Sequence, residues 1–211
     1  EMARHVYFRH NGYISFFYTQ KELKQLVAYA KERNITIVPE IDMPGHFWAA
    51  LVAYPEFSLS GNPQPAEVMP HFDLIRTFGG LGTDTLDPTR EEVYQFVDDI
   101  FTEIVEIFPS PYIHIGGDEV RFDVWQNNPR INEFMKENHI KNVQALQSYF
   151  TSRVNDILRS KGRTLVGWDE ILDGGLPEGA AVMAWRAPRM VKAATAAGAV
   201  TPICSDLLLP P

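Results

Sequence analysis

Hydrophobic residues recur along the chain with a helical period in some stretches and as short continuous runs in others. The first stretch opens with the capping box Thr19-Gln20-Lys21-Glu22 and predicts a helix that ends near Arg33. Its apolar face comprises Leu23, Leu26, Val27 and Ala30. The β-branched run from Ile35 to Ile41 follows this helix and predicts a buried strand.

The same order of helix and strand returns twice. Asp87-Pro88 opens a second predicted helix, which precedes a short apolar strand from Tyr112 to Ile115. The apolar face of that helix comprises Val93, Phe96, Val97, Ile100, Ile104 and Phe108. A third helix spans roughly Val143 to Arg159 and is followed, after Gly162, by a strand from Thr164 to Trp168.

Two weaker strand candidates, Ala181 to Trp185 and Ala199 to Ile203, enclose an Ala-rich helix that begins near Pro188. Alternation of this kind predicts parallel strands with outer helices, so the expected fold class is α/β. The segment from Phe47 to Leu86 is rich in Pro and Gly and follows a strand. We expect it to form a long loop at the mouth of the fold.

The composition limits the possible partners. The chain has 211 residues, of which 45% are hydrophobic, enough for one large domain with a core. With 19 Lys and Arg against 27 Asp and Glu the net charge is −8, which disfavours nucleic acid and anionic membranes as partners. No apolar run approaches the ~20 residues that cross a bilayer. Cys204 is the only cysteine, so an intramolecular disulfide is excluded.

The sequence His114-Ile115-Gly116-Gly117-Asp118-Glu119 carries the strongest indication of chemistry. A strand ends in two glycines, which let the backbone turn and a ligand approach closely, and two adjacent carboxylates follow. Carboxylates at the C-terminal end of a parallel strand are typical of α/β enzymes. A lone Asp-Glu pair can also be a solvated helix N-cap.

Three further strand ends favour a site over a cap. Polar residues or tryptophans follow the strands in Val38-Pro39-Glu40-Ile41-Asp42-Met43-Pro44-Gly45-His46, in Gly167-Trp168-Asp169-Glu170-Ile171 and in Met183-Ala184-Trp185-Arg186. Four successive strands therefore deliver His, Asp, Glu or Trp side chains to the same rim.

The phrases PEIDMPGH, HIGGDE and GWDEI, with AWR downstream, resemble those of glycoside hydrolase family 20, the β-N-acetylhexosaminidases. The resemblance runs from about Tyr18 to Arg186. It implies a (β/α)8 TIM barrel. It also implies exo-hydrolysis of terminal non-reducing β-linked N-acetylglucosamine or N-acetylgalactosamine by a substrate-assisted, retaining mechanism.

By this resemblance Glu119 is the general acid and then the general base, while Asp118 orients the substrate acetamide and stabilises the charge that develops on its nitrogen. The residues fit such a division. In ordinary retaining glycosidases two carboxyl groups stand ~5 to 5.5 Å apart across the scissile bond, whereas Asp118 and Glu119 are sequence neighbours. His46 matches the family histidine that supports the acid/base carboxyl, although a histidine after Pro-Gly can also be a structural turn residue.

Trp168 and Trp185 match family positions whose indoles wall the sugar pocket, because the C–H faces of a pyranose pack on aromatic rings. The alternative is that both are core tryptophans. We expect His114 to point into the barrel behind the catalytic residues. Asp42 either supports the site or holds the Pro-Gly turn.

No metal and no cofactor is expected. The spacing of His46, His114, Asp118 and Glu119 does not form a compact ligand motif such as HExxH. The chain also contains no phosphate loop and no dinucleotide fingerprint.

Earlier and later parts of the family pattern have no match here. The family's sugar-binding arginine and the aspartate partner of its histidine have no counterpart before Tyr18, and its later tyrosine and tryptophan strands have none after Ala199. We therefore expect residues 1–211 to be a partial catalytic domain that lacks the first and last barrel strands. Its open sheet edges predict self-association, and its incomplete sugar site predicts little or no activity of this segment alone.

The leading hypothesis is a β-N-acetylhexosaminidase that acts on amino-sugar glycans or chitooligosaccharides. One alternative is a non-catalytic carbohydrate-binding protein on the same scaffold. Another is a retaining glycosidase with two catalytic carboxylates, Glu119 with Glu170 or Asp42. For Asp169 and Glu170 we expect hydrogen bonding at the rim. The resemblance suggests a periplasmic, secreted or lysosomal protein, and the sequence does not separate gluco from galacto substrates.

Overall fold

The structure of the chain is a computed structural model that describes residues 18–63, 84–187, 189–200 and 202–204. Within these ranges four parallel strands form one sheet, and their order in the sheet is their order along the chain. The strands are β1 (Tyr112–His114), β2 (Thr164–Trp168), β3 (Ala181–Ala184) and β4 (Pro202–Cys204). The predicted α/β class with parallel strands is therefore confirmed.

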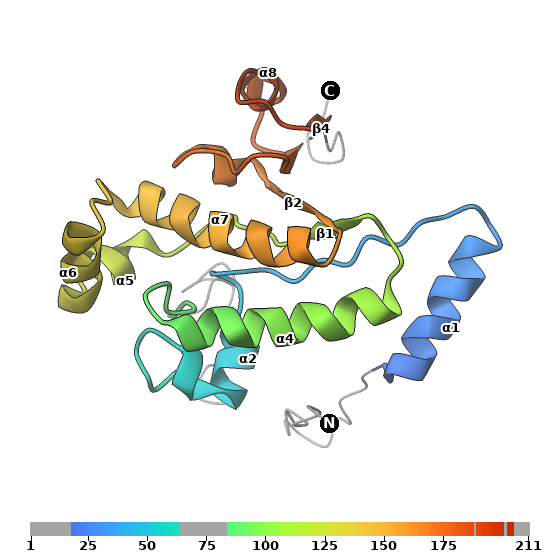
Figure 1. Cartoon of the computed structure of the whole chain (residues 1–211), viewed down its shortest axis with the longest axis horizontal. Helices are drawn as coiled ribbons and strands as arrows, with labels where there is room; N and C mark the ends of the chain where they lie inside the picture. Colours follow the sequence, from blue (N-terminus) through green and yellow to red (C-terminus); the bar gives the residue numbers. More distant parts are fainter. Residues whose placement is uncertain (1–17, 64–83, 188, 201, 205–211) are drawn as a thin grey trace, which may run out of the picture.

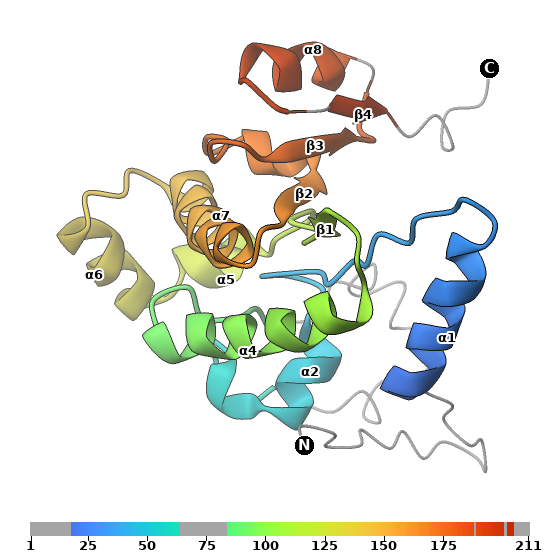
Figure 2. The ribbon, with the colours of Figure 1, turned by 45° about the vertical axis from the view of Figure 1, so that its right-hand side comes forward.

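Helices connect and flank these strands (Figure 1). In the described ranges they are α1 (Gln20–Lys31), α2 (Trp48–Ala53), α4 (Glu91–Ile107), α5 (Phe122–Gln126), α6 (Pro129–Glu137), α7 (Val143–Ser160) and α8 (Arg189–Ala196), with the 3-10 helices η1 (Pro55–Phe57) and η3 (Asp169–Leu172). The long helices α4 and α7 lie side by side, and α8 lies beside β3 and β4 at the opposite end (Figure 2).

Capping residues set the helix boundaries close to the predicted positions. Thr19 Oγ1 accepts a hydrogen bond from Glu22 N at 3.2 Å, and the Glu22 carboxylate accepts one from Thr19 N at 2.7 Å. Helix α7 begins where Asn142 Oδ1 accepts a hydrogen bond from Ala145 N at 2.8 Å. It ends just before Gly162, whose φ of 68° lies in the left-handed region.

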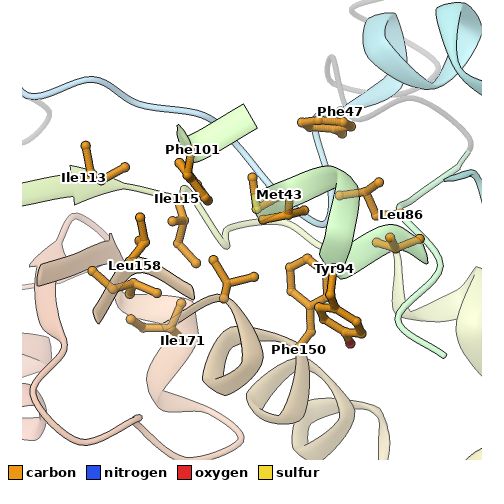
Figure 3. Packing of buried hydrophobic residues seen from close by; sticks show 14 of the residues in the cluster. Met43, Phe47, Leu86, Tyr94, Phe101, Ile113, Ile115, Phe150, Leu158 and Ile171 are labelled. Carbon is orange, nitrogen blue, oxygen red and sulfur yellow. The ribbon is translucent and has the colours of Figure 1, made fainter. Parts of the chain in front are cut away.

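The hydrophobic core lies between the sheet and the helices α4 and α7 (Figure 3). Phe101 of α4, Ile113 of β1 and Phe150 of α7 have no exposed surface, and burial of such side chains stabilises the fold by ~1.5–3 kcal/mol each. Met43, which follows the extended segment beside β1, and Ile171 of η3 extend this core beyond the ends of the strands. Hydrophobic packing therefore fixes the position of the strand ends that carry the candidate residues.

The segment from Ile35 to Ile41 is not the buried strand that its β-branched residues predict. It is extended and joined to β1 by a single parallel bridge between Glu40 and His114. Ile35 and Val38 are 57% and 43% exposed. A β-branched run forms a buried strand only where neighbours cover it, and within the described residues this segment is paired along its β1 edge alone.

The segment from Phe47 to Leu86 is not a continuous loop. Its first part forms α2 and η1, because an apolar run there buries Leu51 and lets Phe47 pack edge-on against Phe96 of α4 at 6.3 Å. An antiparallel bridge joins Ser58, just after η1, to Leu86 at the end of the segment. Residues 64–83 of the predicted mouth loop lie outside the described residues.

The last strand begins later than predicted. Strand β4 starts at Pro202 rather than at Ala199. Val200 N donates a hydrogen bond to Ala180 O at 3.1 Å, and Val200 is 56% exposed, so this residue lies outside the sheet. Two short helices, α5 and α6, connect β1 to α7 and were not predicted, since neither shows a long helical period.

Candidate active site

Three side chains from two neighbouring chain segments meet beyond the C-terminal end of β1. His46 Nε2 lies 3.5 Å from Asp118 Oδ2 and 3.4 Å from Glu119 Oε2. The side chains of His46 and Asp118 are 21% and 16% exposed, whereas that of Glu119 is 43% exposed. The structure thus brings together the three residues that the sequence predicts to be catalytic, and Glu119 is the most open of them to solvent.

Two glycines make this arrangement possible. Gly116 and Gly117 have φ angles of 66° and 89°, which favour glycine. A β-carbon on Gly116 would lie 1.1 Å from Asp42 Oδ1, and one on Gly117 would lie 2.6 Å from Ile171 Cγ2. The space beside each glycine is therefore filled by a neighbouring side chain, and a larger residue at either position would displace it.

His46 and Glu119 also adopt left-handed backbone conformations, with φ angles of 53° and 48°. Such a conformation costs a non-glycine residue of order 1–3 kcal/mol and persists only where the surrounding structure holds it. Strained residues of this kind cluster at functional sites. Both residues that contact each other across the site are thus held in fixed, unfavourable conformations.

The surroundings shift the pKa values of Asp42 and Asp118 in opposite directions. Burial, and then the charge of Asp118, raise the pKa of Asp42 to about 7. Burial also acts on Asp118, but the contact with His46 and further hydrogen bonding outweigh it and hold the pKa of Asp118 below its ordinary value. The contact with Asp118 raises the pKa of His46 to about 9, against the effect of burial. Near neutral pH, His46 is therefore protonated and Asp118 is ionised.

The carboxylate of Asp42 packs against the backbone at Gly116 and interacts electrostatically with Asp118. Asp42 Oδ1 and Asp118 Oδ1 are both buried, and neither has a hydrogen-bond partner in the part of the chain that the structure describes. Two ionised carboxylates can only accept hydrogen bonds, so a proton on Asp42 supplies the donor that the pair otherwise lacks. The raised pKa of Asp42 fits this arrangement.

Trp168 and Trp185, here called the tryptophan wall, stand at the ends of β2 and β3. Their ring centroids are 6.5 Å apart and their planes meet at 69°. Trp168 Nε1 donates a hydrogen bond to Glu40 Oε1, and Trp185 Nε1 donates one to Glu170 Oε2, both at 3.0 Å. Each indole keeps part of its surface exposed, in contrast to the fully buried Trp125. The two tryptophans thus stand next to each other at the ends of neighbouring strands, and neither is fully buried.

His114 lies beneath the wall and is 3% exposed. Its Nδ1 accepts a hydrogen bond from Gly116 N at 3.0 Å, and its ring stands edge-on to that of Trp168 with the centroids 4.7 Å apart. Burial lowers the pKa of His114, which favours the neutral ring that can accept this bond. His114 therefore supports the glycine turn and the wall, and it does not join His46 beside the carboxylates.

An ion-pair network that the sequence analysis missed lies behind the wall. Arg186 Nε donates to Asp169 Oδ2 at 2.5 Å, and its terminal nitrogens donate to Asp173 at 3.2 Å. Asp169 has no exposed surface, and a buried carboxylate needs such a partner. The sequence does indicate such a pairing, because Arg186 follows β3 and an acidic cluster follows the preceding strand β2. Asp169 and Glu170 make rim hydrogen bonds, as expected.

The three catalytic candidates also offer three possible metal ligands, whose atoms lie within 4.8 Å of one another: His46, Asp118 and Glu119. Protonated His46 already supplies a positive charge to both carboxylates, and it would have to lose its proton to bind a metal. The expectation that no metal takes part stays a prediction. Helices in the described ranges are all too short or too polar to span a membrane.

Comparison with known proteins identifies a family. The protein-family model described as "Glycosyl hydrolase family 20, catalytic domain" matches residues 2–207 of the chain. The "Beta-hexosaminidase" of Porphyromonas gingivalis is 41% identical over 172 residues, which are 82% of this chain and 21% of that protein. The chain spans between a fifth and a third of the length of the first curated relatives that it matches.

Solved structures give the same result. The chitobiase of Flavobacterium johnsoniae superposes with a TM-score of 0.74 and 36% identity, over 90% of this chain and 28% of that one. A GH20 exo-β-N-acetylglucosaminidase of Vibrio harveyi, in complex with N-acetylglucosamine, superposes with a TM-score of 0.70 and 29% identity, over 88% of this chain and 28% of that one.

The Gly116 contact predicts a specific effect of substitution. Gly116→Ala should expel the Asp42 carboxylate from its place and lower both stability and activity. Gly162→Ala is a matched control, because Gly162 has nearly the same φ, 68°, but nothing within 4 Å of a built β-carbon. The control should cost only the left-handed backbone term, about 1 kcal/mol. Equal losses of thermal stability in the two variants would contradict a steric role of Asp42.

The raised pKa of His46 predicts a pH-dependent contribution to stability. A group whose pKa rises from 6.5 to about 9 on folding stabilises the fold fully below pH 6.5 and loses this contribution as the pH rises through 9. The difference in free energy of unfolding between the wild type and His46→Gln should therefore shrink over that window. His139→Gln is the control, since His139 is exposed and has a similar φ of 56°. A pH-independent difference for His46→Gln would refute the ion-pair assignment.

Proposed function

Because this chain belongs to glycosyl hydrolase family 20, we propose that it carries the catalytic groups of a β-N-acetylhexosaminidase, which removes terminal non-reducing β-linked N-acetylglucosamine or N-acetylgalactosamine. The observation that carries this proposal is the contact of His46 with the adjacent carboxylates Asp118 and Glu119 at the end of β1. One site thus combines a cation with two carboxylates of different exposure.

Glu119 serves as the acid and then as the base. Its protonated carboxyl gives a proton to the glycosidic oxygen while the bond from that oxygen to C1 breaks, and the substrate's acetamido oxygen forms a bond to C1. Water then attacks C1 of the resulting oxazolinium, the bond from C1 to the acetamido oxygen breaks and restores the acetamide, and Glu119 takes the proton from this water. The greater exposure of the Glu119 side chain, 43%, suits a group that must reach both a leaving group and water.

Asp118 stabilises the charge that develops on the acetamide nitrogen. Its lowered pKa keeps it ionised, so it accepts the acetamide N–H and stands beside the positive charge of the oxazolinium. Asp42 supports Asp118 from behind, where its proton lets the two buried carboxyl groups lie close together. His46 holds both Asp118 and Glu119 in register.

The alternatives have less support. A retaining glycosidase with Glu170 or Asp42 as nucleophile would need that carboxylate free to attack C1. Glu170 accepts a hydrogen bond from Trp185 and lies 3.7 Å from Arg186, while Asp42 is packed against Gly116. A protein that only binds carbohydrate has no need of a charged histidine between two carboxylates. The presence of all three residues at one site therefore favours an enzyme.

The same family membership supports a (β/α)8 barrel of which residues 1–211 form part. The four strands follow one another in chain order, and the segment before Met43 adds to the β1 edge, as consecutive barrel strands do. Amino-sugar glycans or chitooligosaccharides are the substrates that fit; the Vibrio harveyi relative was solved with N-acetylglucosamine. Ile35 and Val38 are exposed beside a sheet edge with which no described residue pairs, which supports self-association of this segment when it is alone.

Glu119→Gln tests the acid role in the intact natural protein that carries this sequence. Turnover of chitobiose should fall by roughly 10² to 10⁴, because its leaving group needs protonation. Turnover of a 4-nitrophenyl N-acetylglucosaminide, whose leaving group needs little help, should fall much less in the first step. Glu103→Gln on α4 is the control and should change neither rate. An equal loss for both substrates would exclude Glu119 as the acid.

Asp118→Asn tests the substrate-assisted step. Loss of the negative charge beside the oxazolinium should raise the activation free energy by about 3 kcal/mol and lower kcat/KM accordingly. A thiazoline analogue of the cyclised sugar should inhibit the wild type strongly and the variant weakly. Asp123→Asn, at an exposed aspartate paired with Arg121, is the control. A glycosyl ester trapped on any Asp or Glu would show that a carboxylate is the nucleophile.

A further inference from the structure

Trp185 is fixed at two points by two consecutive residues of η3. Its backbone N–H donates to Asp169 Oδ1 at 2.8 Å, and its indole N–H donates to Glu170 Oε2 at 3.0 Å. A tryptophan side chain turns about two bonds, and hydrogen bonds at its backbone and at its ring tip together restrict both rotations. The orientation of this indole is therefore set by η3.

Helix η3 is itself tied to the carboxylate turn. Ile171, the residue after Glu170, is buried, and its Cγ2 would lie 2.6 Å from a β-carbon on Gly117. Gly117 directly precedes Asp118 in the sequence. A continuous packed path thus runs from the Asp118 turn through Ile171 to Glu170 and on to the Trp185 indole.

Arg186 keeps η3 and the wall together. It donates to the Asp169 carboxylate and to the Asp169 carbonyl oxygen, and its Nε lies 3.7 Å from Glu170 Oε1. The positive charge offsets the cost of holding two carboxylates next to each other with little exposure, none for Asp169 and 14% for Glu170. The Glu170 acceptor is therefore both oriented and largely shielded from water.

The equivalent bond of the other tryptophan is less protected. Glu40, which accepts from Trp168 Nε1, has a side chain that is 43% exposed. Water competes for an exposed acceptor and reduces the net contribution of the bond. If Glu40 is removed, water can take its place as the acceptor for Trp168. Glu170 is more buried, so its removal should leave the Trp185 indole N–H without an equivalent acceptor.

We propose that Glu170 is a positioning residue for the sugar: it holds the Trp185 indole at the angle at which the wall packs against a pyranose, and it acts through Trp185 alone. This inference rests on the function proposed above. Glu170 touches no reacting atom, so its removal should affect substrate binding more than the chemical step.

The test is made on the intact natural protein that carries this sequence. Glu170→Ala should raise KM for a 4-nitrophenyl N-acetylglucosaminide about tenfold and change kcat less. Glu170→Met removes the acceptor but keeps the side-chain length, so it repeats the test without a cavity. Glu170→Gln keeps an acceptor oxygen and should restore KM to within about twofold of the wild type.

A double-mutant cycle separates positioning from a general structural role. In a Trp185→Phe background there is no indole N–H to hold, so Glu170→Ala should raise KM no further. Glu103→Ala is the control, because Glu103 also accepts one side-chain hydrogen bond, from Gln20 at 2.9 Å, on the outer helices. It should leave KM unchanged. An unchanged KM in Glu170→Ala, or the same increase with and without Trp185, would overturn the proposal.

The indole N–H resonance provides a readout that does not need activity. In ¹⁵N-tryptophan-labelled protein without substrate, the Trp185 signal, assigned by its loss in Trp185→Phe, should move upfield and exchange faster with water in Glu170→Ala. A wild type that cleaves no N-acetylhexosaminide would refute the proposed function, while this signal still tests the anchor. An unmoved signal would overturn the anchor even in a fully active enzyme.

Discussion

The close packing of the Asp42 carboxylate against the backbone at Gly116 is the contact on which the site depends. No β-carbon fits between them, and the turn that follows Asp42 delivers His46, while the turn that follows Gly116 delivers Asp118. One steric contact thus fixes how closely two chain segments approach. The second glycine repeats the arrangement toward η3, where Ile171 fills the space beside Gly117. Because glycines at positions 116 and 117 have no side chain, the neighbouring segments can approach closely enough to bring His46, Asp118 and Glu119 together.

Two cationic side chains, His46 and Arg186, each pair with a different group of acidic residues at the strand ends. His46 faces Asp118 and Glu119, and Arg186 faces the acidic residues of η3 and the adjoining Asp173. Arginine keeps its charge at any relevant pH, which suits a permanent support. Histidine can lose its proton, and its contact with Asp118 raises its pKa to about 9 and so keeps the charge in place. Each half of the rim is thereby balanced by a residue suited to its task.

Local sequence signals predicted what short-range physics controls. The capping box at Thr19, the helical period of α7 and the strand from Thr164 to Trp168 appear in the structure close to their predicted bounds. The strand predicted from Ile35 failed, because burial depends on neighbours that no local pattern encodes. The meeting of His46 with Glu119 followed from the rule that parallel strands end at one rim. The role of Arg186 did not, since it requires knowing which strand ends are adjacent.

The two parts of the site differ in the sequence distance that their contacts span. Glu170 and Trp185 are 15 residues apart, whereas Glu40 and Trp168 are 128 apart. Contacts that close short loops lose less chain entropy and form sooner in folding. The Glu170–Trp185 contact is thus made within one short stretch that contains η3 and β3. Substitutions within this short stretch can therefore change how the Trp185 indole is held, while the contact of His46 with the carboxylates, formed between distant segments, stays as it is.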